Sequence, residues 1–241
     1  MCIRDSLGGV TGIFEMPNTN PLTITPEAME FKLKKAHETS YVDFAFYFGG
    51  TAEYAEHLSE WENIDGVCGI KIFMGASNGD LLSATDEEID AIVANGKRVI
   101  AVHAEDESIM NENKITILGD SNDVAMHYKW RSEESCLNAT KRIVSIAKKY
   151  SRNVHILHIT TAQEMSFLKA NKDIASAEVL ANHLTLHAPD CYDMFGTLAQ
   201  QNPPIREKHH QDALWAAVAD GTVDIVAVSY THLRAHETSL H

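Results

Sequence analysis

The stretch GIKIFM, residues 69–74, is a run of strand-forming apolar residues with Lys71 inside it. Burying an ammonium group is costly unless the group is paired or neutral, so a lysine in such a strand needs an explanation. For an isolated lysine, an ion pair or a side chain that snorkels to solvent is the ordinary explanation. The other is a lowered pKa that lets the amine react with carbon dioxide, giving a carbamate whose two oxygens suit two divalent metal ions. The stretch therefore predicts a buried strand that contains a candidate functional residue.

Strand-like and helix-like segments alternate on both sides of this stretch, which is typical of a parallel α/β sheet. Strands are predicted at Gly9–Met16, Val42–Phe48, Gly69–Met74, Arg98–His103, Asn153–Ile159, Ala177–Asn182 and Val223–Ala227. Helices are predicted at Pro26–Thr39, Asp86–Ala94, Glu133–Lys149 and Ala162–Ala170. Two of these helices open on capping-box spacings, Thr85 with Glu88 and Thr161 with Glu164.

The number of strands indicates the fold class. Seven strands in about 220 residues, without a repeat or a linker, predict one α/β domain over residues 7–227. We expect a (β/α)8 TIM barrel that is one strand short, with a doubly wound open sheet as the alternative. The barrel is favoured because polar residues recur at the C-terminal ends of the strands, and in barrels that face carries the chemistry.

The two ends differ from this body. MCIRDS at residues 1–6 and the segment from VSYTHL onward, residues 228–241, match nothing in the rest of the chain. Both can be encoded by DNA strings that are nearly reverse complements of each other, as expected for a sequencing adapter translated together with a gene fragment. We expect both ends to be non-native, so their histidines carry no weight in a site argument.

The composition excludes several classes of partner. With 20 basic and 34 acidic residues the formal charge is −14, which argues against nucleic acids and anionic membrane surfaces. There is no apolar run of about 18 residues and no signal-peptide pattern. Four cysteines lie far apart without a CxxC pair, as is usual in a reducing cytosol. We expect a cytoplasmic protein that acts on a small molecule and has no nucleic-acid or membrane partner.

Two histidines stand near the ends of apolar strands. His103 ends VIAVH and His158 follows VHIL, and each precedes polar residues. One such histidine is more often a hydrogen-bonded core residue, but two on separate strands, beside a buried lysine on a third, indicate a metal centre. Strand alternation places His155 and His158 on opposite faces, and His158 is nearer the C-terminal end. The pair at residues 209–210 lies in a charged stretch and is expected at the surface.

Two asparagines are flanked by prolines. Asn18 lies in MPNTNP, residues 16–21, and Asn202 in QNPPIR, residues 201–206. Such asparagines are commonly turn residues. An amide also offers the donor and the acceptor that a ring imide or ureide substrate requires. His183, just after the strand predicted at Ala177–Asn182, is as well placed to reach a site as to serve a structural role.

Five segments, taken in order, resemble dihydroorotases of the amidohydrolase superfamily: GGVTGIFEMPNTNP, GVCGIKIFMGASNGDLL, VHAEDE, HILHITTAQE and QNPPIR. The resemblance extends from about Gly8 to Ala227, and MPNTNP is its most specific element. It implies a barrel with two zinc ions per site, bridged by a carboxylated lysine and a hydroxide. Lys71 matches the bridging lysine.

The resemblance also implies roles for other residues. His103 and His158 match metal-binding histidines, and Asn18 and Asn202 match residues that bind the dihydroorotate carboxylate or ring. His183 matches one member of a family His-His pair and is taken as substrate-binding, although Asn182 stands where the other histidine is expected.

Two family elements are not found. The first strand of the family supplies D-x-H-x-H-x-R, and the last ends in D-H-A-P, whose aspartate binds metal and moves the proton. The sequence begins after the first element and matches the last strand only to Ala227. We therefore expect an incomplete barrel, an acid–base aspartate just after Ala227 and no catalytic residue retained before it, and an inactive chain as it stands. Asp224 lies too early in its strand to be a substitute.

The activity implied for the parent enzyme is the reversible hydrolysis of L-dihydroorotate to N-carbamoyl-L-aspartate in pyrimidine biosynthesis, and a homodimer is one assembly that this allows. One alternative is a hydantoinase or allantoinase. Another is a non-catalytic, dihydroorotase-like partner of a transcarbamoylase. The presence of Lys71, His103 and His158 together argues against the second alternative, since such homologues tend to lose metal ligands.

Overall fold

A computed structural model describes residues 8–75 and 81–228. The ends that we predict to be non-native, residues 1–6 and 228–241, lie outside these residues except for Val228. The described residues form two compact units. The first lies within residues 1–103 and 142–155, and the second within residues 104–141 and 156–241. The prediction of a single domain over residues 7–227 stays a prediction.

The strands confirm the predicted sheet. They are β1 (Gly12–Glu15), β2 (Asp43–Gly49), β3 (Val67–Phe73), β4 (Ile100–His103), β5 (Val154–Ile156), β6 (Ala175–Leu180) and β7 (Ile225–Ala227). Their order in the seven-stranded sheet is the order of the chain. The pairs β1–β2, β2–β3, β3–β4 and β6–β7 are parallel. A doubly wound sheet reverses its strand order at a switch point, so this order supports the barrel type instead.

The four predicted helices are confirmed to within one residue. The α-helices are α2 (Pro26–Thr39), α3 (Leu58–Trp61), α4 (Asp86–Ala94), α5 (Glu107–Asn113), α6 (His127–Trp130), α7 (Glu133–Tyr150), α8 (Ala162–Lys169), α9 (Ala181–Thr185), α10 (Asp190–Phe195) and α11 (Lys208–Ala219). Shorter turns are the 3-10 segments η1 (Ala52–His57), η3 (Val124–Met126) and η4 (Gly196–Ala199) and the π-helical η2 (Lys114–Leu118). The helices missed by sequence analysis are mostly too short to show a 3.6-residue period.

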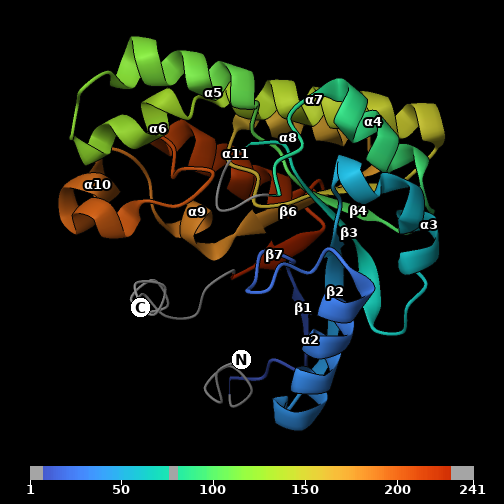
Figure 1. Cartoon of the computed structure of the whole chain (residues 1–241). Coiled ribbons are helices and arrows are strands. Elements are labelled where there is room, and N and C mark those ends of the chain that lie inside the picture. The colour runs from blue at the N-terminus through green and yellow to red at the C-terminus, as the bar shows by residue number, and fades with distance from the viewer. Residues whose placement is uncertain (1–7, 76–80, 229–241) are drawn as a thin grey trace. The chain divides into compact units, whose positions relative to one another are not determined.

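Hydrophobic burial explains the first unit. Helix α2 packs against β2, and both lie at the blue end of the colour scale in Figure 1. From Ile70 to Phe73, β3 is buried on both of its faces, as expected for a strand inside a parallel sheet with helical layers. Helix α4 contributes the fully buried Ile89 and Ile92 to this core. The alternation of β3 is therefore hidden in the sequence, because both faces are apolar.

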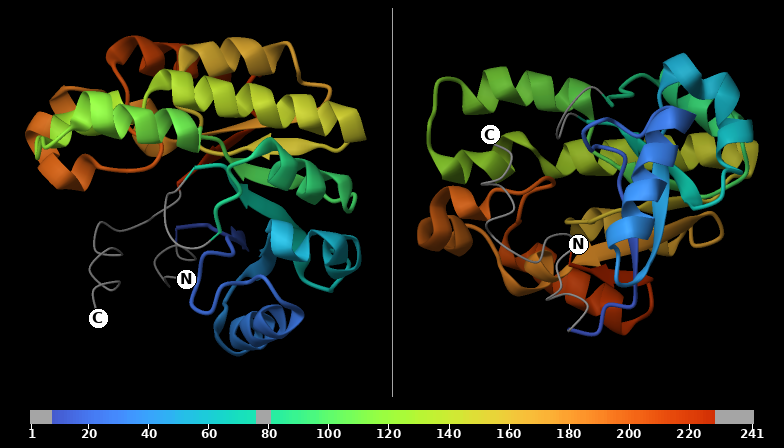
Figure 2. Two further views of the ribbon diagram at one scale, coloured as in Figure 1. Left: turned by 45° about the horizontal axis from the view of Figure 1, so that its top comes forward. Right: turned by 60° about the horizontal axis from the view of Figure 1, so that its bottom comes forward.

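In the second unit a separate apolar cluster forms around Tyr192, joined by Ala188, Cys191, Ala199 and Ile205. The Tyr192 ring stacks on Tyr128 with centroids 5.5 Å apart, and its hydroxyl donates to the Ile205 carbonyl at 3.2 Å. This cluster connects α10 with the segment that leads into α11. Helix α7, which has residues in both units, is continuous in both views of Figure 2.

The strand predicted at Ala177–Asn182 was placed too late. Strand β6 ends at Leu180, and Ala181 and Asn182 open helix α9. The turn is closed when Leu186 N–H donates to the Asn182 carbonyl at 2.9 Å. The apolar residues around Leu180 fit a strand or a buried helix equally well, and for this reason the boundary was not visible in the sequence.

The capping box predicted at Thr85 is confirmed and gives a stability test. The Thr85 side chain accepts from Glu88 N–H at 3.2 Å, and the Glu88 carboxylate accepts from Thr85 N–H at 3.0 Å. Thr85→Ala should therefore lower the free energy of unfolding by about 1 kcal/mol, measured by urea denaturation. Thr39→Ala, at the exposed end of α2, serves as the control and should change it by less than about 0.5 kcal/mol. Equal effects of the two substitutions would contradict the assignment.

Candidate functional site

Lys71 and His103 lie on neighbouring strands of the first unit and on the same face of the sheet. The register pairs Lys71 with Ala101 and Phe73 with His103. Paired residues of parallel strands point to one side, as do residues two apart along a strand. Both side chains are buried, with 2% of each residue exposed. The structure thus brings together two of the three predicted metal ligands, with donor atoms and burial that fit a metal centre.

The Lys71 ammonium is held inside the unit. Its Nζ donates to the Ile72 carbonyl at 2.8 Å and lies 3.8 Å from the centroid of the Phe73 ring. The Phe73 ring in turn lies 6.1 Å from the His103 imidazole, centroid to centroid. The predicted burial of Lys71 is therefore confirmed, and the amine stands next to an aromatic face instead of reaching solvent.

His158 belongs to the second unit and follows β5 in a left-handed backbone conformation, with φ of 41°. This conformation is unfavourable for a residue with a side chain. Glu178 supports it from both sides of the residue: its carboxylate accepts from His158 N–H at 3.2 Å, and its carbonyl accepts from Ile159 N–H at 2.8 Å. Strain that the surroundings enforce is common where a side chain must be aimed at a functional site. The joining of His158 with Lys71 and His103 stays a prediction.

Asn18 is exposed on an anchored loop of the first unit. Thr23 N–H donates to the Pro17 carbonyl at 2.9 Å, and Lys32 Nζ donates to the Met16 carbonyl at 2.8 Å. Both anchors lie next to Asn18 in the chain, so its backbone is fixed while its amide side chain faces solvent. This arrangement fits the predicted role in binding a ligand.

His183 and Asn202 are brought together in the second unit. His183, in α9, is buried, and its Nε2 lies 3.2 Å from the Pro203 carbonyl oxygen and 2.5 Å from Gln201 Nε2. Two buried atoms, His183 Nδ1 and Asn202 Oδ1, have no hydrogen-bond partner within the described part of the chain. Buried polar atoms are nearly always paired, so these two atoms beside one loop are open to pairing with a ligand or a water molecule.

Arg206 fixes the end of this loop, a role that sequence analysis missed. Its buried guanidinium donates to Thr160 Oγ1 at 3.2 Å, to the Tyr128 carbonyl at 2.8 Å and to the Arg131 carbonyl at 2.5 Å. Further bonds reach the Ser132 carbonyl and Cys136 Sγ. One side chain thus ties the segment after His158, the start of α7 and the loop of Asn202 to one another. Its place at the end of QNPPIR was the one sequence feature that pointed to Arg206. His127, which also contacts this loop, lies in none of the motifs identified in the sequence.

Glu105 and Arg131 form a buried ion pair beside this network. Arg131 Nε donates to Glu105 Oε1 at 3.0 Å, and its Nη2 donates to the other carboxylate oxygen. At most 4% of either side chain is exposed. Because Glu105 is two residues after His103 in the chain, this pair fixes the backbone that leaves β4.

The electrostatics of the second unit keep its buried histidines neutral. Burial lowers the pKa of His183 to about 4, with a further contribution from the Arg206 charge, while the Pro203 carbonyl acts in the opposite direction. Burial is also the main cause of the lowered pKa of His127. Neutral imidazoles bind a neutral ring or a metal ion more readily than charged ones.

Glu133, His209 and His210 have the composition of a metal site, with one potential ligand atom each within 4.8 Å of the others. The expectation that both histidines are at the surface was wrong for His210, which is fully buried. Its Nδ1 accepts from Ala162 N–H at 3.1 Å, so the neutral ring carries its proton on Nε2, which lies 3.0 Å from Glu133 Oε1. A metal-bound histidine normally donates through its other nitrogen, which is impossible here. We assign this group a structural role.

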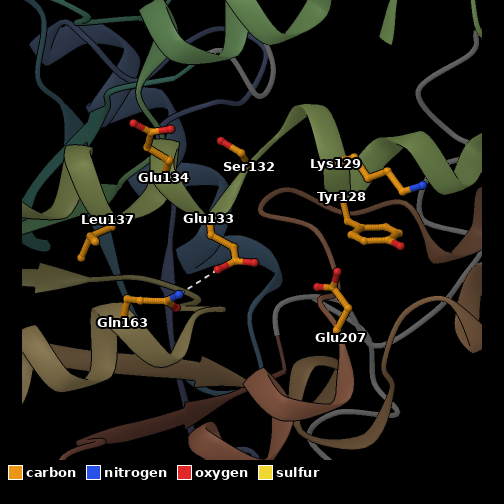
Figure 3. Close-up of a pocket in the computed structure, with 8 residues that line it drawn as sticks. All are labelled: Tyr128, Lys129, Ser132, Glu133, Glu134, Leu137, Gln163 and Glu207. Atoms are coloured by element: carbon orange, nitrogen blue, oxygen red, sulfur yellow. Dashed lines mark hydrogen bonds between the residues drawn. The ribbon is translucent and has the colours of Figure 1, made fainter. Parts of the chain in front are cut away.

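The hollow drawn in Figure 3 has a volume of about 410 Å³ and lies in the second unit. The carboxylates of Glu133 and Glu207 and the ring of Tyr128 surround it, and Gln163 donates to Glu133 at 2.9 Å. None of the six predicted site residues lines it. The hollow is therefore separate from the predicted site, and nothing in its lining indicates a ligand.

Comparisons with known proteins agree with the fold and with the sequence motifs. A dihydroorotase of Methanosarcina mazei is 29% identical over 95% of this chain and 52% of its own length. An allantoinase of Bacillus velezensis is 30% identical over 93% of this chain and 51% of its own. The solved L-hydantoinase (dihydropyrimidinase) of Arthrobacter aurescens superposes with a TM-score of 0.85 at 25% identity, over 92% of this chain and 51% of that one. No family model matches the chain.

The fold is of the β/α-barrel type, and Lys71 and His103 are buried on one face of its sheet. The chain is similar to dihydroorotases, to an allantoinase and to an L-hydantoinase. It spans about half the length of the curated relatives that it matches. None of the helices that the structure describes is both long enough and apolar enough to cross a membrane.

The ion pair of Glu105 gives a second stability test. Glu105→Gln leaves the Arg131 guanidinium buried without its counter-charge and should lower the free energy of unfolding by roughly 3–5 kcal/mol. Glu134→Gln, an exposed change at the start of α7, is the matched control. The double variant Glu105→Gln/Arg131→Met should recover part of the loss. A Glu105→Gln protein as stable as the control, by urea denaturation, would contradict the buried pair.

The lowered pKa of His183 predicts a pH-dependent stability. The unfolded chain protonates this ring below pH 6.5, whereas the folded protein does so only near pH 4. The stability that its burial contributes is therefore complete above pH 6.5 and is lost as the pH falls toward 4, by roughly 3 kcal/mol. His183→Gln should flatten the slope of unfolding free energy against pH in this window, and His209→Gln should not. The prediction fails if both variants keep the wild-type slope.

Proposed function

We propose that this protein is a dihydroorotase, catalysing the reversible hydrolysis of L-dihydroorotate to N-carbamoyl-L-aspartate in pyrimidine biosynthesis. The observation that carries the proposal is the buried lysine of β3 beside the buried histidine of β4, in a chain whose first relatives are named dihydroorotase. The small-molecule substrate and a cytoplasmic location follow from the same proposal, and a homodimer is one assembly that it allows.

The proposed metal centre draws on three nitrogen-bearing residues. Lys71, as its carbamate, together with His103 and His158 would hold two zinc ions. When bound, zinc would supply a water of lowered pKa and would polarise the ring carbonyl. Lys71 contributes a buried side chain, which as a carbamate would offer oxygen ligands.

The substrate-binding residues complete the proposal. The loop of Asn18 and the loop of Asn202, which Arg206 holds, each offer an amide side chain. Such an amide can form a hydrogen bond with a carbonyl or an N–H of a cyclic amide. His183 supplies a neutral nitrogen without a partner beside the second loop. Fixed polar groups around a ring position the scissile bond before reaction, which is the main contribution that such residues make to a rate.

An allantoinase or hydantoinase is the second candidate, and it rests on the 30% identity to the Bacillus velezensis allantoinase and on the fold of the Arthrobacter enzyme. The test is turnover by the protein made from the gene's complete open reading frame, with L-dihydroorotate, allantoin and hydantoin offered in parallel. We expect loss of dihydroorotate and formation of N-carbamoyl-L-aspartate. Turnover of allantoin or hydantoin alone would replace the proposal with the second candidate, and a metal-free protein without turnover would favour a non-catalytic role.

Lys71→Met in the same protein should abolish most of the activity, by about 10³-fold, equivalent to about 4 kcal/mol of transition-state stabilisation. It should also lower the zinc content measured by mass spectrometry, because a thioether cannot form the carbamate. Lys97→Met, an exposed lysine of the first unit, is the control and should leave both unchanged. A Lys71→Met protein that keeps its zinc and its rate would remove Lys71 from the site.

A further inference from the structure

The carbonyl groups of the two residues that flank Asn202 are each contacted by a buried histidine. His127 Nε2, from the start of α6, lies 3.0 Å from the Gln201 carbonyl oxygen. His183 Nε2, from α9, lies 3.2 Å from the Pro203 carbonyl oxygen. His127 and His183 are 56 positions apart in the chain. They contact the loop one residue before and one residue after Asn202.

The chemistry of these contacts fixes the proton on each ring. A carbonyl oxygen can only accept, so each Nε2 must carry a hydrogen. Burial keeps both rings neutral near pH 7, and a neutral imidazole has a single N–H. His127 is therefore assigned the Nε2–H tautomer. The same tautomer at His183 requires the Gln201 carboxamide to be turned, because its nitrogen lies 2.5 Å from His183 Nε2 and its oxygen accepts from Asn182 Nδ2 at 3.1 Å. O and N of an amide are exchangeable in such a network.

The side chain between the two held carbonyls is left with an unsatisfied atom. Asn202 Oδ1 is buried and makes no hydrogen bond of standard geometry among the residues that the structure describes, although the Asn202 side chain lies close enough to the His127 ring to raise the pKa of that ring, against the larger lowering by burial. Its backbone is fixed on both sides, and Arg206 fixes the loop four residues further on. A backbone that is held while a side-chain oxygen stays unpaired is the arrangement expected when a ligand supplies the missing donor.

We infer that His127 and His183 are positioning residues that hold Asn202 so that its carboxamide oxygen accepts a hydrogen bond from the ring N–H of a cyclic amide substrate; this rests on the proposed function. Neither histidine is required to transfer a proton. Their contribution is to fix an acceptor in place before the substrate arrives, which strengthens substrate binding without changing the chemical step.

Substitution by glutamine or asparagine separates this role from a merely structural one. The glutamine amide nitrogen reaches about as far along the side chain as Nε2, whereas that of asparagine corresponds in position to Nδ1. His127→Gln and His183→Gln should therefore retain the bond to the loop carbonyl, while His127→Asn and His183→Asn should lose it. A structural role that depends only on packing would not distinguish a donor at one position from a donor at the other.

The first experiment is nitrogen-15 NMR of the histidine rings in the 241-residue chain near pH 7, which requires no activity. We expect the Nε2–H tautomer for both His127 and His183, and loss of each signal in the corresponding glutamine variant assigns it. An Nδ1–H tautomer at either ring would show that this ring does not donate to its loop carbonyl. It would overturn the positioning role of that histidine, whatever the function of the protein proves to be.

The second experiment is steady-state kinetics of the protein made from the complete open reading frame, with L-dihydroorotate. Each asparagine variant should raise KM about tenfold while kcat stays within about threefold, as expected for loss of one hydrogen bond that acts in binding. The His127→Gln variant should lie close to wild type, and His183→Gln should have a lower KM than His183→Asn. His209→Gln is the exposed control. Equal KM values for the asparagine and glutamine variants would overturn the inference. A wild-type protein without turnover would overturn the proposed function and the substrate assignment. If both rings are still the Nε2–H tautomer, the contacts of His127 and His183 with the loop of Asn202 remain supported.

Discussion

Burial of the Lys71 ammonium inside β3 is the constraint on which the account of this protein depends. A charged amine in an apolar strand costs several kcal/mol unless it is compensated. Here the strand is buried on both faces, and the amine meets a backbone carbonyl and the Phe73 ring. The Phe73 ring also lies 6.1 Å from the His103 imidazole, centroid to centroid. A lysine and a histidine buried on one face of neighbouring strands are the basis of the proposed metal centre, and β/α barrels place their chemistry at the C-terminal ends of the strands.

In the second unit, buried polar and charged groups are likewise compensated by hydrogen bonds. Arg206 uses its fork of N–H donors to join three segments, and every partner of the guanidinium that the structure describes is neutral. The resulting positive charge contributes to the lowered pKa of His183. Neutral histidines can then hold the loop of Asn202 from both sides. The arginine, the histidines and the asparagine thus form one connected system, in which His183 Nδ1 and Asn202 Oδ1 have no hydrogen-bond partner of standard geometry among the described residues.

The sequence predicted the seven strands and the four main helices, because apolar runs and capping pairs are local signals. It also predicted the burial of Lys71 and His103, since a polar residue inside an apolar strand is visible in one dimension. It could not predict that His210 is buried or that His127 meets the Gln201 carbonyl, because these contacts join residues 48 and 74 positions apart. The end of β6 was missed because an apolar segment near Leu180 fits either a strand or a helix. The union of Lys71, His103 and His158 in one centre stays a prediction.

The most direct test of the central claim is carbon-13 NMR of the protein made from the complete open reading frame, loaded with zinc in the presence of carbon-13 bicarbonate. A carbamate on Lys71 gives a labelled carbonyl resonance that no other lysine should produce. The account predicts this signal in the wild-type protein and its absence from the Lys71→Met variant. A zinc-loaded wild-type protein without the signal, or a signal that persists in Lys71→Met, would contradict the role given to the buried lysine and with it the metal centre.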